Sequence, residues 1–150
     1  YTIVAYAVDT AGNVGSFSNT FTYYSIKVLK IDFTSIDFGE IVPCVEKIVS
    51  GDKDMTTPDK PTVQNIGNDP FYITVHFSVM TGETYGKTIE DFDAVFKGEK
   101  LYLKASETGT FSNPLNPCET EQIDFSIHAP LGTPSDIYTG TLTIGISETP

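Results

Sequence analysis

Apolar and polar residues alternate along several short stretches of this chain. The clearest stretch is 71–79, where every second residue is apolar and the residues between are Tyr72, Thr74, His76 and Ser78. A period of two places alternate side chains on opposite faces of a strand, so this pattern predicts a strand with one buried face. Residues 123–128 and 138–146 alternate in the same way.

Turn residues separate these stretches at short intervals. Phe92, Ala94 and Phe96 lead through Lys97-Gly98-Glu99 to Leu101 and Leu103, which predicts a β-hairpin. No window shows a sustained helical period, so we expect an all-β fold, an antiparallel sandwich or barrel. His76 and Asp124 should face solvent. The predicted core is Phe71, Ile73, Val75, Phe77, Ile123, Phe125, Ile127, Leu142 and Ile144.

Residues 1–24 differ from the rest and predict a separate β-hairpin, whereas residues 25–150 hold enough strands for a core of their own. The first strand is apolar or amphipathic on both faces, which is typical of a buried strand. An isolated hairpin cannot bury itself. We therefore expect this segment to pair with β-structure outside its own sandwich, either in an upstream part of the polypeptide or in a neighbouring copy. The residues expected to form this assembly strand are Tyr1, Ile3, Val4, Ala5, Tyr6 and Val8.

The charge of the chain narrows its possible partners. The formal net charge is −11, and every basic residue is Lys. Nucleic-acid readers rely on basic stripes and on Arg, so nucleic acid is a poor partner, and an anionic membrane surface is disfavoured for the same reason. No apolar run is long enough for a membrane helix, so no membrane insertion is expected. We interpret the acidity as a source of solubility.

The two cysteines, Cys44 and Cys118, are far apart in sequence, and each directly follows a proline. Two loop cysteines in an oxidising compartment are natural disulfide partners, which predicts a bridge between them. The alternative is two free thiols, since sequence alone does not place their Cβ atoms.

Carboxylates are the main candidates for metal binding. Asp52 and Asp54 resemble the start of a calcium loop, and Glu90, Asp91 and Asp93 form the second dense cluster. The glycine and the bidentate glutamate of a full calcium loop are missing, so solvated carboxylates are the main expectation and a weak Ca²⁺ site is the alternative. No other cofactor is expected.

Catalytic chemistry has no support in the sequence. His76 and His128 lie on the polar faces of their strands and would bind metal only if those strands were neighbours. A nucleophile elbow and a phosphate-binding loop are both absent. Tyr72 and Tyr102 face outward and offer surfaces for stacking on sugars, although the chain lacks Trp. We expect no enzyme activity.

Two resemblances to known families follow from these residues. Residues 1–13 resemble the penultimate strand and the Asp-x-Ala-Gly-Asn turn that close bacterial and archaeal immunoglobulin-like repeats. This favours the end of an incomplete immunoglobulin-like domain over an intersubunit strand. Segments 36–43, 62–68 and 129–142 resemble immunoglobulin-like sandwich modules of prokaryotic, above all archaeal, surface proteins. Cys44 and Cys118 occupy places where those modules have glycine, which fits the expected disulfide.

These resemblances imply an antiparallel immunoglobulin-like β-sandwich over 25–150 that is preceded by an extra N-terminal β-hairpin. They imply a non-catalytic structural role at the cell surface or outside the cell, in a surface layer, filament or adhesin stalk. The expected partners are other surface modules or copies of the same chain. The alternative is a glycan-binding module of a secreted protein.

Overall fold

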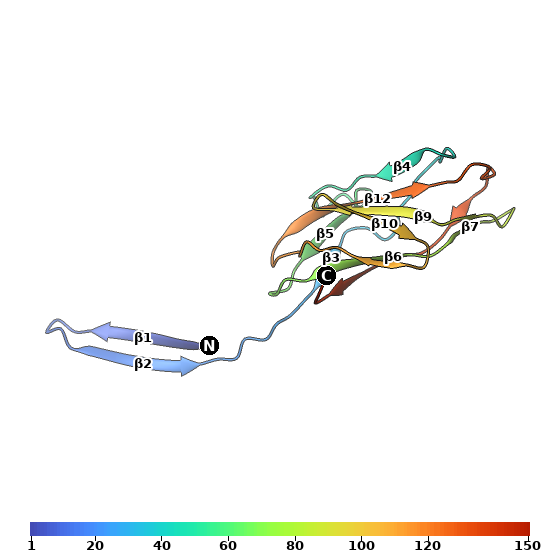
Figure 1. Cartoon of the computed structure of the whole chain (residues 1–150). Helices are drawn as coiled ribbons and strands as arrows, with labels where there is room; N and C mark the ends of the chain where they lie inside the picture. Colours follow the sequence, from blue (N-terminus) through green and yellow to red (C-terminus); the bar gives the residue numbers. More distant parts are fainter.

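The computed structural model describes residues 1–150 and contains strands but no helix. A hairpin projects at one end, and a β-body follows it through an extended connection (Figure 1). The strands are β1 (Thr2–Val8), β2 (Val14–Thr20), β3 (Leu29–Ile31), β4 (Glu46–Val49), β5 (Thr62–Asn65), β6 (Tyr72–Phe77), β7 (Met80–Gly82), β8 (Thr88–Ile89), β9 (Asp91–Phe96), β10 (Glu99–Lys104), β11 (Thr108–Thr110), β12 (Thr120–His128), β13 (Tyr138–Thr139) and β14 (Leu142–Ser147).

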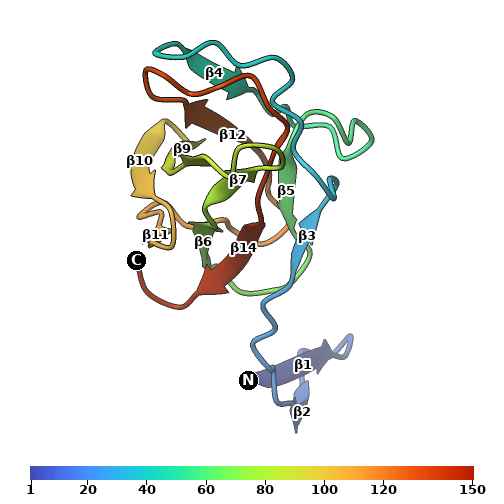
Figure 2. The ribbon, with the colours of Figure 1, turned by 90° about the vertical axis from the view of Figure 1, so that its right-hand side faces the viewer.

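The body consists of antiparallel sheets. The larger sheet has the order β10-β9-β12-β5-β3, and β4 also pairs with β12. A three-stranded sheet, β11-β6-β14, lies opposite it (Figure 2). The strands β13, β7 and β8 form a small third sheet. The predicted all-β antiparallel fold is confirmed, and the facing layers are consistent with a β-sandwich.

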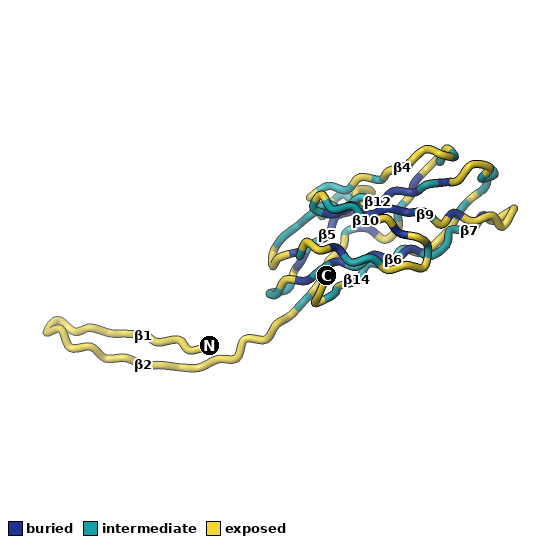
Figure 3. The backbone as a smooth tube through the Cα atoms, viewed as in Figure 1, coloured by how far each residue is buried: buried dark blue, intermediate teal, exposed yellow.

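The core lies between the two main sheets. The Phe77 ring from β6 stacks on Phe92 from β9 with 4.6 Å between ring centroids, and it packs edge-on against Phe125 from β12 at 5.9 Å. Large aromatic side chains contribute most of the apolar area that such a core removes from water. In Figure 3 the buried, dark blue stretches lie along the strands of the body.

Most of the predicted core is confirmed. Residues Phe71, Ile73, Val75, Phe77, Ile123, Phe125 and Ile127 are all buried. Leu142 and Ile144 are only half-buried, although both pack against the core. The reason is that β14 pairs on one side only, with β6, and so forms an edge of its sheet. His76 and Asp124 lie on the strand faces that point away from the core, and they are half-buried rather than fully exposed.

The predicted hairpin of β9 and β10 is also present. Glu99 pairs with Phe96, so the loop consists of Lys97 and Gly98 alone. Their φ angles are 49° and 79°. Positive φ at both central residues is typical of the tight turn whose twist matches that of two antiparallel strands, and glycine adopts it without strain.

The N-terminal hairpin pairs only with itself. β1 and β2 are in register from Thr2 opposite Thr20 to Val8 opposite Val14. The Asp9 carboxylate closes the turn, because it accepts hydrogen bonds from the backbone N–H groups of Ala11 and Asn13 and from the Asn13 amide. Both strands are exposed along their whole length (Figure 3).

Candidate functional site

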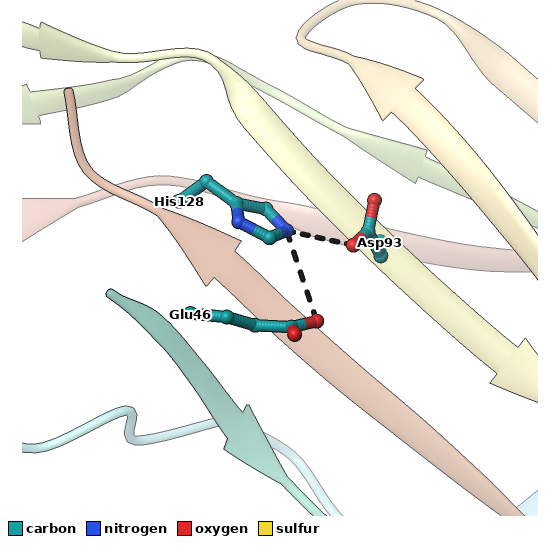
Figure 4. Close-up of side chains that lie close together, drawn as sticks. All are labelled: Glu46, Asp93 and His128. Atoms are coloured by element: carbon teal, nitrogen blue, oxygen red, sulfur yellow. Dashed lines mark hydrogen bonds and ion pairs between the residues drawn. The ribbon is translucent and has the colours of Figure 1, made fainter. Parts of the chain in front are cut away.

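A group of charged side chains lies on the outer face of the larger sheet, over β4, β9, β10 and β12. Phe92 and Ile127 point into the core, so their neighbours Asp93 and His128 point outward. The register places Asp93 opposite Ser126, and His128 opposite Glu46. The pairing of three strands thus brings Glu46, Asp93 and His128 together, as Figure 4 shows. We call these three residues, with Lys100 and Ser126, the sheet-face cluster.

Asp93 lies at the centre of the sheet-face cluster. Its Oδ2 atom accepts a hydrogen bond from Lys100 Nζ at 2.8 Å and lies 2.7 Å from His128 Nε2. Glu46 Oε1 lies 3.1 Å from the same Lys100 Nζ and 3.8 Å from His128 Nε2, and it accepts a hydrogen bond from Ser126 Oγ at 2.9 Å. The Asp93 side chain is only 4% exposed, so this carboxylate depends on its protein partners.

The electrostatics follow from these contacts. Burial raises the pKa of Asp93, but hydrogen bonds from Lys100 and His128 outweigh it, and the pKa lies below its usual value. The pKa of Glu46 is also lowered, first by the hydrogen bond from Lys100 and then by that from Ser126. The two carboxylates raise the pKa of Lys100. The cluster therefore holds two carboxylates and one ammonium group at neutral pH.

The metal-ligating potential of the cluster comes from three residues. One ligand atom each from Glu46, Asp93 and His128 can be chosen so that all three lie within 4.8 Å of one another. Sequence reasoning singled out Asp93 but missed Glu46 and underrated His128. The alternation of residues 123–128 placed His128 on a polar face, yet only the strand pairing shows which side chains share that face.

The other predicted calcium ligands make contacts of their own, although Asp91 lies opposite His128 in the register of β9 and β12. Asp91 forms an ion pair with Lys104, and Glu90 accepts a hydrogen bond from the Thr88 hydroxyl. Asp52 and Asp54 lie in the polar loop before β5. Asp52 accepts hydrogen bonds from the Asp54 N–H and from the hydroxyls of Thr57 and Thr62, whereas Asp54 accepts them from Thr56. The structure gives both carboxylates a role in shaping this loop, and the Ca²⁺ site stays a prediction.

The two histidines do not meet. His76 lies on β6 and His128 on β12, which belong to different sheets. His76 Nδ1 instead lies 3.2 Å from the Thr108 hydroxyl on the neighbouring strand β11. A site shared by the two imidazoles is therefore excluded.

The two candidate stacking tyrosines also lie apart. Tyr102 is exposed on β10 of the larger sheet, and Tyr72 is half-buried on β6 of the opposite sheet. Both face away from the core that separates the two sheets, so they cannot form one flat platform for a sugar. The structure does not bring together the aromatic surface that a glycan-binding role would use.

The predicted disulfide is wrong for this chain, because Cys44 and Cys118 are free and exposed. The Cys44 N–H donates to the carbonyl of Ala129, just after the end of β12, whereas Cys118 lies just before its start. A nine-residue strand spans about 30 Å, and a disulfide needs Cα atoms within about 7 Å. Both cysteines have a φ of 63°, so they occupy positions where the chain turns sharply.

The predicted assembly strand is exposed on both faces of the N-terminal hairpin. Tyr1, Ile3, Val4, Ala5, Tyr6 and Val8 are all exposed. On the second strand, Val14 and Phe17 are exposed as well. Val14 lies opposite Val8 on one face of the hairpin, and Phe17 lies opposite Ala5 on the other, so both faces expose apolar side chains.

The body also carries an apolar groove of about 500 Å³ between β14 and the segment that follows β3. Phe33, Phe77, Leu142 and Ile144 line it. The groove follows from the open edge of β14, and no charged side chain lines it.

No protein-family model matches the chain, and neither does any curated protein sequence. No helix that could cross a membrane is present.

Proposed function

We propose that this protein is a non-catalytic structural module of an extracellular or cell-surface assembly, and that residues 1–24 join it to its neighbours by strand pairing. The observation that carries this proposal is the exposure of the N-terminal hairpin. Its apolar side chains are exposed on both faces; the Tyr6 residue, for example, is 71% exposed. A two-stranded hairpin with both faces in water is marginal, so the natural state of this element is a paired one.

The edges of the hairpin support strand pairing as the mode of contact. β1 pairs with β2 and with no other strand, so each presents one row of unpaired N–H and C=O groups. Such edges accept further strands, and pockets for alternate side chains then select the partner. The partners in this proposal are other surface modules or copies of the same chain.

The charge distribution also supports the N-terminal hairpin as the element that contacts a partner. Asp9 is the only charged side chain within residues 1–24, although the chain as a whole has a net charge of −11. A hairpin with a single charged side chain avoids most of the electrostatic repulsion that would separate two acidic bodies. The hairpin is thus the part of the molecule best suited to close contact with a second acidic module.

The location and the fold family in this proposal rest on sequence resemblance. Residues 1–13 resemble the end of an immunoglobulin-like repeat, and segments in 36–142 resemble immunoglobulin-like modules of archaeal and other prokaryotic surface proteins. We therefore place the module at the cell surface, in a surface layer, filament or stalk. Its two-layer antiparallel body suits this role because a packed sandwich resists deformation.

The test compares the full chain with a chain that begins at Ser25. In purified protein the hairpins of two copies are the only partners available, so the full chain should self-associate with rising concentration. The shortened chain should stay monomeric in sedimentation and light-scattering experiments. It should also unfold at nearly the same temperature, because the body holds the whole core.

Matched point variants distinguish association through the hairpin from nonspecific association through other surfaces. Val4→Lys and Tyr6→Lys place charge on the hairpin, and Tyr102→Lys places the same charge on the exposed face of β10. Only the two hairpin variants should reduce self-association. A full chain that stays monomeric at every accessible concentration, or a chain from Ser25 that fails to fold, would overturn the proposal.

A further inference from the structure

The sheet-face cluster has a chemistry that a purely structural module does not need. It gathers an imidazole and two carboxylates from three strands, and it keeps a carboxylate nine-tenths buried on the outer face of a sheet. We propose that Glu46, Asp93 and His128 form a binding site for a divalent transition-metal ion of the zinc class. In the metal-free protein the Lys100 ammonium group pairs with the two carboxylates of this site. This inference rests on the cluster alone and is independent of the proposed role of the hairpin.

The ligand types select the class of metal. Zinc and neighbouring transition metals bind imidazole nitrogen together with carboxylate oxygen, commonly with three protein ligands and one water. Calcium instead needs six to eight oxygen ligands, which this cluster does not supply. One imidazole and two carboxylates therefore fit zinc better than calcium.

The spacing of the ligand atoms fits the same ion. Bonds of about 2.0–2.1 Å in tetrahedral geometry place ligand atoms about 3.3 Å apart. His128 Nε2 lies 2.7 Å from Asp93 Oδ2 and 3.8 Å from Glu46 Oε1, so the observed distances bracket that value. All three ligand atoms lie within 4.8 Å of one another, so side-chain shifts alone would complete the site, and the fixed register of β4, β12 and β9 holds the three residues in place.

The charge of the cluster leaves room for a divalent ion. Glu46 and Asp93 share a single ammonium group, so one negative charge remains uncompensated in a partly desolvated setting. Lys100 belongs to the edge strand β10, and its Nζ atom lies 5.0 Å from the centre of the exposed Tyr102 ring. The ammonium group can move over this ring into solvent while an ion with two positive charges takes its place.

Metal binding requires a change of tautomer at His128. An ionised Asp93 carboxylate can only accept, so the 2.7 Å contact requires Nε2–H as the donor, whereas a metal needs the Nε2 lone pair. The proton moves to Nδ1, which has no partner within the protein, on a side chain that is 38% exposed. Only the position of the proton on the imidazole changes, Lys100 leaves as an ammonium ion, and no further reactant is required. The Ser126 hydroxyl, which donates to Glu46, keeps that carboxylate oriented.

The experiment is a calorimetric titration with ZnCl₂, and with CaCl₂ in parallel. It uses protein with Cys44→Ser and Cys118→Ser, because exposed thiols would bind zinc on their own. One zinc ion per chain should bind, and Lys100→Met should tighten binding at least tenfold because the competing cation is gone. His128→Gln should weaken binding at least tenfold. His76→Gln is the matched control and should change nothing, since that histidine lies on the other sheet.

A second measurement tests the ligands spectroscopically, and a third checks that each variant is folded. The Co²⁺ complex should show the visible absorption of a low-symmetry site, lost in His128→Gln and kept in His76→Gln. Circular dichroism identifies any variant that has unfolded, and Glu46→Gln then replaces it as the ligand variant. The proposal is overturned if zinc does not saturate at one ion per chain, if His128→Gln binds as the parent does, or if Ca²⁺ binds as tightly as zinc.

Discussion

The ammonium group of Lys100 lies 2.8 Å from the Oδ2 atom of Asp93, a carboxylate that the rest of the sheet has almost removed from water. Removing a partner from such a pair leaves a charge without compensation. We expect Lys100→Met to lower the free energy of unfolding by about 2 kcal/mol, less than for a fully buried pair because Lys100 is itself half-buried. Urea denaturation at neutral pH in the absence of metal measures this value.

The control for this change is the neighbouring pair of Lys104 and Asp91. Both of these side chains are exposed, at 64% and 44%. Lys104→Met should therefore cost less than about 0.5 kcal/mol. Equal costs for the two lysine variants would show that burial of Asp93 does not govern the stability of this sheet face.

Acid should destabilise the protein. The pKa values of seven carboxyl groups lie below their usual range because the fold gives them hydrogen bonds or cationic neighbours. A group with a lowered pKa binds fewer protons in the folded state than in the unfolded state, so it stabilises the fold above the unfolded pKa, and this contribution is lost as the pH falls. The groups are Asp9, Glu46, Asp52, Asp69, Asp93, Glu119 and Asp136.

The pH window follows from the usual values of these groups, 3.8 for Asp and 4.5 for Glu. Stability should be nearly constant from about pH 7 to 6 and should fall below about pH 5. Chemical denaturation at several pH values measures this dependence. Glu119→Gln should flatten the slope, because it removes a carboxylate that accepts from Lys97 and from the backbone of Asn116. A denaturation midpoint that rises as the pH falls would contradict the lowered pKa values of these carboxyl groups.

The central phenylalanine of the core gives a direct test of packing. Phe125 is fully buried and lies edge-on against Phe33 and Phe77. Phe125→Ala should lower the free energy of unfolding by about 3–5 kcal/mol, through lost burial and the cavity that remains. Leu131→Ala is the control, since Leu131 is 87% exposed and its loss should cost little. A loss below about 1 kcal/mol at Phe125 would mean that the core repacks around it.

The burial of Phe125 was predictable from sequence because alternation with period two is a local property of one strand. The half-burial of Leu142 and Ile144 was not, since it depends on β14 being an edge strand. Pairing order arises from contacts between distant segments, which a local pattern does not encode. The same limit explains the wrong disulfide, because the loops of Cys44 and Cys118 look alike in sequence but lie beyond opposite ends of β12.

The sheet-face cluster shows this limit most clearly. Its residues come from strands far apart in the sequence, and the pairing of β4 and β9 with β12 is what unites them. A dense acidic run such as Glu90–Asp93 attracts attention in sequence, yet alternation places Asp91 and Asp93 on the outer face beside different lysines. Spacing along the chain predicts a ligand set poorly in a sheet, because neighbours across strands matter more than neighbours along them.

The last prediction concerns the connection between the hairpin and the body. The Asn68 side chain accepts a hydrogen bond from the Ile26 N–H at 2.7 Å and donates one to the Tyr24 carbonyl at 2.9 Å. The Asn68 N–H also donates to the Ile26 carbonyl, and the Asn68 carbonyl accepts from the Tyr23 hydroxyl, so this one residue holds the connecting segment against the body through four hydrogen bonds. A connection held in this way fixes where the hairpin points, which a module that pairs with its neighbours requires.

Asn68→Ala removes the two hydrogen bonds of the side chain but keeps the two made by the backbone of this residue. Because the segment is exposed, we expect the free energy of unfolding to fall by no more than about 1 kcal/mol. Hydrogen exchange at the Ile26 amide should accelerate markedly, and small-angle scattering of the monomer should show a broader range of hairpin positions. Asn113→Ala, which removes an exposed amide contact to Glu99 that does not involve the connecting segment, should alter neither measurement. Unchanged exchange at Ile26 in the Asn68 variant would show that the backbone alone holds the segment, and the directional role of Asn68 would then be wrong.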